Sequence, residues 1–154
     1  MHSLYKTQKL PIDIETAWKF LSVPENLKTI TPSYMGFEMT SRHHGNVMYA
    51  GQIITYLVKP VMGIPLKWCT EITHVQEPHY FVDEQRMGPY QFWHHQHKLK
   101  EIKNGVLMED IIHYKLPLGV LGNIANSIMV SGQLEEIFEY RQKKLIELFG
   151  DYKE

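Results

Sequence analysis

The amino-acid sequence predicts an α+β fold, in which a curved antiparallel sheet is combined with a long C-terminal helix and two short helices follow the first strand. Two observations lead to this prediction. Strand-like runs follow one another from residue 35 to residue 116 with turn signals between them, which is typical of antiparallel pairing. From residue 120 to residue 149, apolar side chains instead recur at spacings of three and four, the period of a helix with one apolar face.

The N-terminal part is expected to form one strand and two short helices. The strand is predicted at Ser3–Leu10. Asp13 is well suited to cap the first helix, because its carboxylate can accept hydrogen bonds from the first turn. The second short helix is expected to begin at Pro24, since proline suits a first helical turn, and to end before Pro32.

Six further strands are expected, separated by turns. They are placed at Met35–Arg42, Gly51–Val58, Leu66–Gln76, His79–Arg86, Tyr90–Ile102 and Val106–Leu116. The pair Asn104-Gly105 is a strong hairpin signal, so the last two strands should be neighbours. The stretch Lys59–Pro65 contains two prolines and a glycine and is expected to be a loop.

The helix expected over Val120–Phe149 raises a question of packing. Ser131 and Gly132 interrupt its middle and could allow a kink. If the helix lay flat on the sheet, the interior would be a solid core. If the sheet wrapped around the helix, a cavity would open between them.

Composition and charge indicate one domain over residues 1–154 and exclude several classes of partner. The formal net charge is -1 and apolar residues make up 44% of the chain, so a sizeable core is expected and a strongly basic surface is not. No nucleic-acid partner is therefore expected. No apolar run approaches the roughly 20 residues of a membrane span, so no integral membrane association is expected either. With Cys69 as the one cysteine and no apolar core of signal-peptide length at the N-terminus, a cytoplasmic location is expected.

The stretch Phe81–His97, FVDEQRMGPYQFWHHQH, is the most informative part of the sequence. Alternate side chains of a strand lie on opposite faces, so Trp93, His95 and His97 share one face. That face is the more apolar one and is expected to point inward. Because buried polar groups need partners, the stretch marks either a polar network inside the core or a binding site.

The neighbouring strands should add further side chains to the same region. The inward set of the last strand is expected to be Met108, Asp110, Ile112 and Tyr114. The set one strand before the histidines is Phe81, Asp83 and Gln85. Because the Asn-Gly hairpin makes the last two strands neighbours, the Asp110 carboxylate is expected to meet the imidazole of His95 across the pair.

The sequence resembles the START/birch-pollen-allergen superfamily, also called SRPBCC or polyketide cyclase-like. The residues that carry the resemblance are ENLKTITP at 25–32, Trp68 with Thr70, FVDEQ at 81–85, Gly88-Pro89-Tyr90, Trp93, His95, His97, Asp110, Tyr114, LPLG at 116–119 and IFEYR at 137–141. They are similar to a bacterial subfamily with the pattern GPYxxWxHxHxF. The chain departs from that pattern at Leu99, where the pattern ends in Phe.

The resemblance implies a helix-grip fold, with the sheet wrapped around the C-terminal helix and a deep, largely apolar cavity between them. Members bind lipids, sterols, hormones or polyketides, so the expected ligand is an apolar or amphipathic, lipid- or polyketide-like small molecule, with no cofactor. The residues expected to form the ligand site are Trp68, Thr70, Asp83, Gln85, Trp93, His95, His97, Met108, Asp110, Ile112 and Tyr114.

The residues leave several alternatives open. The His and Asp side chains could form a ligand-binding or acid–base cluster, or a purely structural network. A metal site with His95, His97 and Asp110 as ligands has no supporting HExxH-like or cysteine-rich signature, so no metal is expected. The protein could also be a polyketide cyclase or dehydratase with His95 as base and Tyr114 as acid, or a non-catalytic regulatory module that acts through its surface. The sequence does not determine catalytic residues or the oligomeric state.

Overall fold

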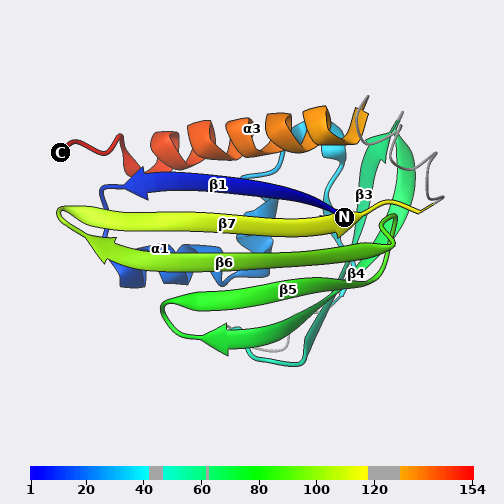
Figure 1. Ribbon diagram of the computed structural model, residues 1–154, viewed down its shortest axis with the longest axis horizontal. Coiled ribbons are helices and arrows are strands. Elements are labelled where there is room, and N and C mark those ends of the chain that lie inside the picture. The colour runs from blue at the N-terminus through cyan, green and yellow to red at the C-terminus, as the bar shows by residue number, and fades with distance from the viewer. Residues whose placement is uncertain (42–46, 62, 118–128) are drawn as a thin grey trace.

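A computed structural model describes residues 1–41, 47–61, 63–117 and 129–154. Its centre is a seven-stranded antiparallel sheet with the strand order β1-β7-β6-β5-β4-β3-β2. The strands are β1 (His2–Leu10), β2 (Glu38–Met39), β3 (Gln52–Val61), β4 (Ile64–Gln76), β5 (Tyr80–Met87), β6 (Phe92–Ile102) and β7 (Gly105–Lys115). Figure 1 shows β1, β7, β6 and β5 running side by side and β3 turned away from them at one end, so the sheet is curved.

The helices lie where the predicted α+β fold requires them. They are α1 (Ile14–Leu21), the 3-10 helices η1 (Pro24–Lys28) and η2 (Ser33–Met35), and α3 (Ser131–Phe149). Asp13 caps α1, because its carboxylate accepts a hydrogen bond of 2.7 Å from the backbone N–H of Thr16. The helix-grip arrangement predicted from the sequence is confirmed. None of the helices within the described ranges is both long enough and apolar enough to cross a membrane.

Two predicted element boundaries are wrong. The strand expected at Met35–Arg42 is reduced to the two residues of β2, because η2 continues to Met35 and ends at Gly36, whose left-handed conformation (φ 53°) turns the chain. The loop expected at Lys59–Pro65 is instead a hairpin in which β3 continues to Val61 and β4 begins at Ile64. Proline is tolerated here because the strand register shifts between Val58 and Val61, and irregular positions need fewer backbone donors.

The helix predicted over Val120–Phe149 is confirmed from Ser131 onwards, while residues 118–128 lie outside the described residues. The buried positions of α3 are Leu134, Phe138, Arg141 and Leu145, at alternating spacings of four and three. Figure 1 shows α3 running along β1, and the side-chain amide of Gln8 donates a 3.0 Å hydrogen bond to the carbonyl oxygen of Gln142. The helix therefore presents one narrow stripe to the interior, and that stripe includes an arginine.

Two groups of buried apolar residues lie beneath the helices. The larger joins residues of α1 to the sheet and to Leu145 near the C-terminal end of α3. The smaller brings Ile112 and Tyr114 of β7 against Leu134 and Phe138 of α3. Between these groups and the short helices, the interior is not completely filled.

Replacing Leu145 with Ala should lower the free energy of unfolding by about 2–5 kcal/mol, because a cavity would form in the larger core. Leu145 is 1% exposed, whereas Leu148 on the same helix is 46% exposed. Leu148→Ala is therefore the matched control, with an expected change within about 0.5 kcal/mol. Urea unfolding monitored by circular dichroism measures both, and equal losses would show that α3 is not held through Leu145.

Candidate functional site

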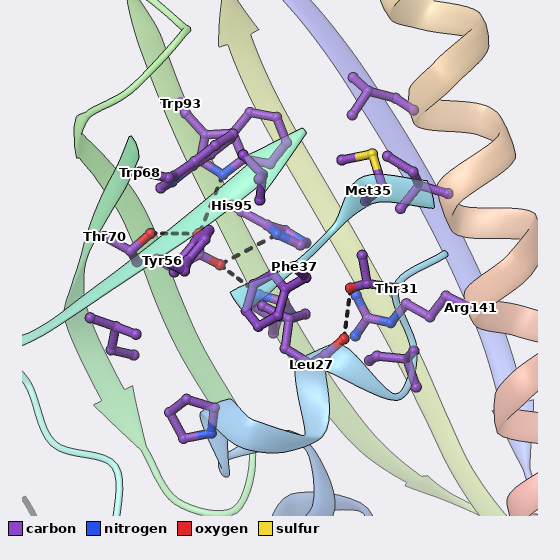
Figure 2. A pocket seen from close by; sticks show the side chains of 18 of the residues that line it. Leu27, Thr31, Met35, Phe37, Tyr56, Trp68, Thr70, Trp93, His95 and Arg141 are labelled. Carbon is purple, nitrogen blue, oxygen red and sulfur yellow. Dashed lines mark hydrogen bonds and ion pairs between the residues drawn. The ribbon is translucent and has the colours of Figure 1, made fainter. Parts of the chain in front are cut away.

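A pocket of about 410 Å³ lies between the curved sheet, the short helices and α3 (Figure 2). Ligand pockets in proteins typically measure roughly 300–1,000 Å³ and combine apolar walls with a few placed polar groups. This one fits that description, because most of the side chains that line it are apolar or aromatic. It is therefore the candidate site.

Aromatic side chains form one wall of the pocket. The ring centroids of Trp68 and Trp93 are 5.3 Å apart with an interplanar angle of 88°, an edge-to-face arrangement. Tyr90 packs against both rings. Tyr56 stacks on Trp68, and its hydroxyl lies 2.9 Å from the hydroxyl of Thr70. Burial raises the pKa of Tyr56 and of Tyr90, so both phenols are neutral at neutral pH.

A corner in the chain holds this wall in place. The side-chain amide of Gln85 donates a 2.7 Å hydrogen bond to the carbonyl oxygen of Tyr90 and accepts one of 3.1 Å from its N–H. The turn at Gly88 passes so close that a Cβ there would be 2.4 Å from Oε1 of Gln85. Gln85 therefore fixes Tyr90 with both of its polar atoms, and it is not among the residues that line the pocket.

A buried network of carboxylates and imidazoles lies next to the aromatic wall. Nε2 of His95 is 2.9 Å from Oδ1 of Asp110, which confirms the predicted contact of these side chains across β6 and β7, although the residue directly opposite Asp110 in the register is His97. Nε2 of His97 is 2.8 Å from Oδ2 of Asp83, and Nδ1 of His95 is 3.4 Å from the same oxygen. Asp83 also accepts a hydrogen bond of 3.2 Å from Nε1 of Trp93.

Asp110 is the deepest member of the network. Its Oδ1 lies 3.0 Å from Nδ1 of His97, although the direction of approach does not meet hydrogen-bond geometry. The same oxygen lies 3.4 Å from Nη1 of Arg141 on α3. Asp110 does not line the pocket, and His95 and His97 lie between its carboxylate and the open space. Its position is that of a supporting residue, which orients the two imidazoles.

The two carboxyl groups of this network have lowered pKa values. Burial tends to raise the pKa of Asp110, but the Arg141 guanidinium, the hydrogen bond with His95 and the nearby His97 outweigh burial and hold that pKa well below its usual range. Burial also tends to raise the pKa of Asp83, and the charge of His95 and the hydrogen bond of His97 lower it overall. Both carboxyl groups are therefore ionised at neutral pH.

The two imidazoles respond differently to the same surroundings. Burial lowers the pKa of His95, and the charge of His97 lowers it further. Burial also acts to lower the pKa of His97, but its close approach to the Asp110 carboxylate and its hydrogen bond with Asp83 outweigh burial and raise it. The carboxylates of Asp83 and Asp110 thus lie against the imidazoles of His95 and His97, and Asp110 also lies against the guanidinium of Arg141.

The pocket brings together six of the predicted site residues, which are Trp68, Thr70, Asp83, Trp93, His95 and His97. Of the predicted residues on β7, none lines it. The side chains of these β7 residues point inward, as predicted. Ile112 and Tyr114, however, are covered by Leu134 and Phe138 of α3, and Met108 belongs to the larger core. The prediction that Met108, Ile112 and Tyr114 line the pocket is therefore wrong. Tyr114 is 3% exposed, which also leaves the cyclase alternative without an accessible acid at this position.

Arg141 is the main site residue that the sequence analysis missed. It is 7% exposed, it lines the pocket, and it lies on the buried stripe of α3 between Phe138 and Leu145. The sequence did contain a signal for it, because a charged residue stands at a position of the helical repeat where an apolar residue is expected. Also missed was the wall made by the short helices and the segment after them, including Leu27, Thr31, Met35 and Phe37.

Asp83, His95 and His97 could hold a metal ion, since one ligand atom of each lies within 4.8 Å of the others. Two imidazoles and one carboxylate are a known donor set for transition metals. The third residue of this set is Asp83, which faces the pocket, and not Asp110 as in the sequence-based alternative. His97 and Asp83 of this set are hydrogen-bonded to each other at 2.8 Å, so the same groups also serve as partners within the buried network.

The opposite pKa shifts of the two histidines predict opposite pH dependences of stability. His97, whose pKa is raised above 6.5, stabilises the fold fully below pH 6.5, and this contribution is lost as the pH rises through the raised value. His95, whose pKa is lowered below 6.5, contributes stability above pH 6.5 that is lost as the pH falls through the lowered value. Each effect has a limiting slope of about 1.4 kcal/mol per pH unit.

Urea unfolding across this pH range checks the prediction with two variants. In the parent protein, His97 should make stability fall as the pH rises above 6.5, and His97→Gln should remove this fall. His95 should make stability fall as the pH drops below 6.5, and His95→Gln should remove that loss. His79→Gln, which removes an exposed imidazole outside the network, is the control. Changes of the same sign in the two network variants would contradict the assignment of charges.

No family model matches the chain, and no curated protein sequence matches it. Among solved structures, it is similar to a START superfamily protein from Mycobacterium smegmatis at 14% identity and a TM-score of 0.70, with 96% of this chain and 99% of that chain covered. Protein CV1439 from Chromobacterium violaceum is similar at 11% identity and a TM-score of 0.71, with 97% and 98% covered.

A plant protein extends the comparison. Ginseng major latex-like protein 151 from Panax ginseng is similar at 10% identity and a TM-score of 0.66, with 96% of this chain and 97% of that chain covered. At such identities the likeness concerns the arrangement of the elements. The chain thus has the helix-grip, START-like fold of the superfamily that its sequence resembles.

Proposed function

We propose that the protein binds an apolar or amphipathic, lipid- or polyketide-like small molecule in the pocket between the sheet and α3. The observation that carries this proposal is the pocket itself, with a volume of about 410 Å³ and predominantly apolar and aromatic walls. A space of this size and lining would be costly to leave unfilled, because its walls lose packing contacts. An apolar chain restores those contacts.

The polar network sets how such a ligand is oriented. Asp83, His95 and His97 line the pocket, while the aromatic wall and the side chains of the short helices supply apolar contact area. A ligand with one polar end would place it near this network and its apolar part against Trp68 and Trp93. The proposal is for a binding module of one domain, with the cytoplasmic location expected for a chain with a single free cysteine.

An enzyme of the cyclase or dehydratase type is less well supported. His95 faces the pocket and its pKa is lowered, as a general base would require, but the acid assigned to Tyr114 is covered by α3. A role as a surface-mediated regulatory module has no specific support among the described residues. Binding without chemistry is therefore the function we propose.

Narrowing the pocket should weaken binding of a neutral apolar probe. Leu66 lines the pocket, so Leu66→Trp should raise the dissociation constant for the dye N-phenyl-naphthylamine by about tenfold or more, since steric overlap typically costs about 1–3 kcal/mol. Ile53, which is 51% exposed and does not line the pocket, provides the control Ile53→Trp, with an expected change of less than about twofold.

Titration of dye fluorescence measures both variants, and circular dichroism checks that they fold. If the parent protein does not bind the dye, the proposed function is overturned. If Leu66→Trp and Ile53→Trp bind it equally well, the dye occupies another surface, and the assignment of the pocket is overturned.

A further inference from the structure

The pocket contains buried hydrogen-bond donors that the protein does not use. Among the described residues, the buried side-chain nitrogens and oxygens without a hydrogen-bond partner are Nε1 of Trp68, Nδ1 of His97 and Nε of Arg141. All three belong to residues that line the pocket. The indole and guanidinium nitrogens can only donate, so the pocket offers donors to whatever fills it. A complementary ligand must bring acceptors.

Arg141 is the strongest of these donors. Its side chain extends from α3 into the pocket, across from Trp68 and Trp93 (Figure 2). A guanidinium stays charged in any protein environment, and burying such a charge is costly unless it is well paired. Within the described residues, the carboxylate within 4.0 Å of Arg141 is Asp110, at 3.4 Å, which is longer than a good charged hydrogen bond. Arg141 also lies 5.6 Å from the ring centroid of Phe138, a weaker contact.

Asp110 does not satisfy the whole guanidinium. The nitrogen that faces it is Nη1, whereas the unpartnered nitrogen is Nε. Oδ1 of Asp110 is in addition shared with the imidazoles of His95 and His97, at 2.9 Å and 3.0 Å. The attraction between Asp110 and Arg141 is thus divided among several partners. Among the described residues, no group pairs with the Nε edge of Arg141.

We propose that the ligand is a carboxylic acid with an apolar chain, whose carboxylate Arg141 binds through its Nε edge while the chain runs along the aromatic wall. This inference rests on the proposed binding function and names the head group. A planar carboxylate matches the fork of a guanidinium and forms charge-assisted hydrogen bonds with it. An alcohol would form a weaker, neutral bond, and an ammonium group would be repelled by Arg141.

The surroundings of Arg141 also restrict how many negative charges the head group of the ligand can carry. Asp83 and Asp110 are both near this end of the pocket, where Arg141 lies 3.4 Å from Asp110 and the imidazole of His97 lies within 3.0 Å of both carboxylates. A singly charged carboxylate adds one negative charge next to Arg141. A dianionic phosphate would add two in the same low-dielectric region, with no further lysine or arginine among the residues that line the pocket. The arrangement favours a carboxylate over a phosphate.

Three probes of equal chain length test the head group: dodecanoate, dodecanol and dodecylamine, measured by calorimetry or by displacement of N-phenyl-naphthylamine. The parent protein should bind dodecanoate about 10- to 100-fold more tightly than dodecanol, the usual range for a hydrogen bond to a charged group, and dodecylamine least tightly. Arg141→Met, which keeps an unbranched, flexible side chain but removes the guanidinium, should lose this preference for the acid while it still binds dodecanol. Lys144→Met removes a half-buried cation that does not line the pocket from the same helix and should keep the preference.

The outcomes separate this inference from the proposed function. If the parent binds dodecanol as tightly as dodecanoate, or if Arg141→Met keeps the preference for the acid, the carboxylate inference is overturned and the binding function stands. If the parent binds the neutral dye but none of the three probes, the inference is likewise overturned. If neither the dye nor any probe binds, both are overturned.

A spectroscopic measurement on the parent protein decides the question if Arg141→Met fails to fold. Dodecanoate labelled with an NMR-active isotope at its carboxyl carbon reports whether the bound acid is ionised. Paired with Arg141, the bound carboxylate should remain ionised at pH values where the free acid has become protonated, because an adjacent cation lowers the pKa of a carboxyl group. A bound signal that titrates like the free acid would overturn the inference.

Discussion

One carboxylate oxygen, Oδ1 of Asp110, connects the three parts of the molecule that form the site. It lies within 3.4 Å of nitrogens from His95 and His97 on β6 and from Arg141 on α3, while Asp110 itself belongs to β7. A buried anion of this kind is stable only while its partners stay in place, and its partners avoid the cost of burial only while the anion remains. The orientation of α3 over the sheet is thereby coupled to the orientation of the imidazoles that face the pocket.

This arrangement gives the pocket one polar end and otherwise apolar walls. Polar atoms gather where β5, β6 and α3 approach one another, and apolar side chains of β4, the short helices and the rest of α3 make up the remaining walls. The network uses most of its own hydrogen-bonding capacity internally, through Asp83 and Asp110. The nitrogens that it leaves without partners belong to a small set of residues in the wall of a largely apolar space.

The part of the site that lies on neighbouring strands could be predicted from the sequence, because strand geometry leaves few choices. Alternation along β6 and the Asn104-Gly105 hairpin were sufficient to place His95 beside Asp110. Alternation does not reveal what covers an inward-facing residue. The packing of Leu134 and Phe138 over β7 therefore decided that Ile112 and Tyr114 are core and not pocket wall.

Features that depend on tertiary packing could not be predicted from the sequence pattern. Arg141 occupies a helix position where an apolar residue is the rule, and only the position of Asp110 in space explains an arginine there. The extent of β2 was overestimated because the stop at Gly36 depends on a left-handed conformation that flanking residues do not indicate. The β3–β4 hairpin was taken for a loop because proline usually ends strands, although an irregular register accommodates it.

The corner formed by Gln85 and Gly88 restricts which substitutions the protein can accept at these two positions. The amide of Gln85 pairs with both backbone groups of Tyr90, much as the peptide of an additional strand would, and Gly88 leaves room for it. A side chain at position 88 would displace this amide and free the backbone that carries an aromatic wall residue, although neither Gln85 nor Gly88 lines the pocket. A substitution at one of these two positions should therefore require a compensating substitution at the other. Changes in the lining of the pocket are then expected to begin with side chains that lie outside this corner.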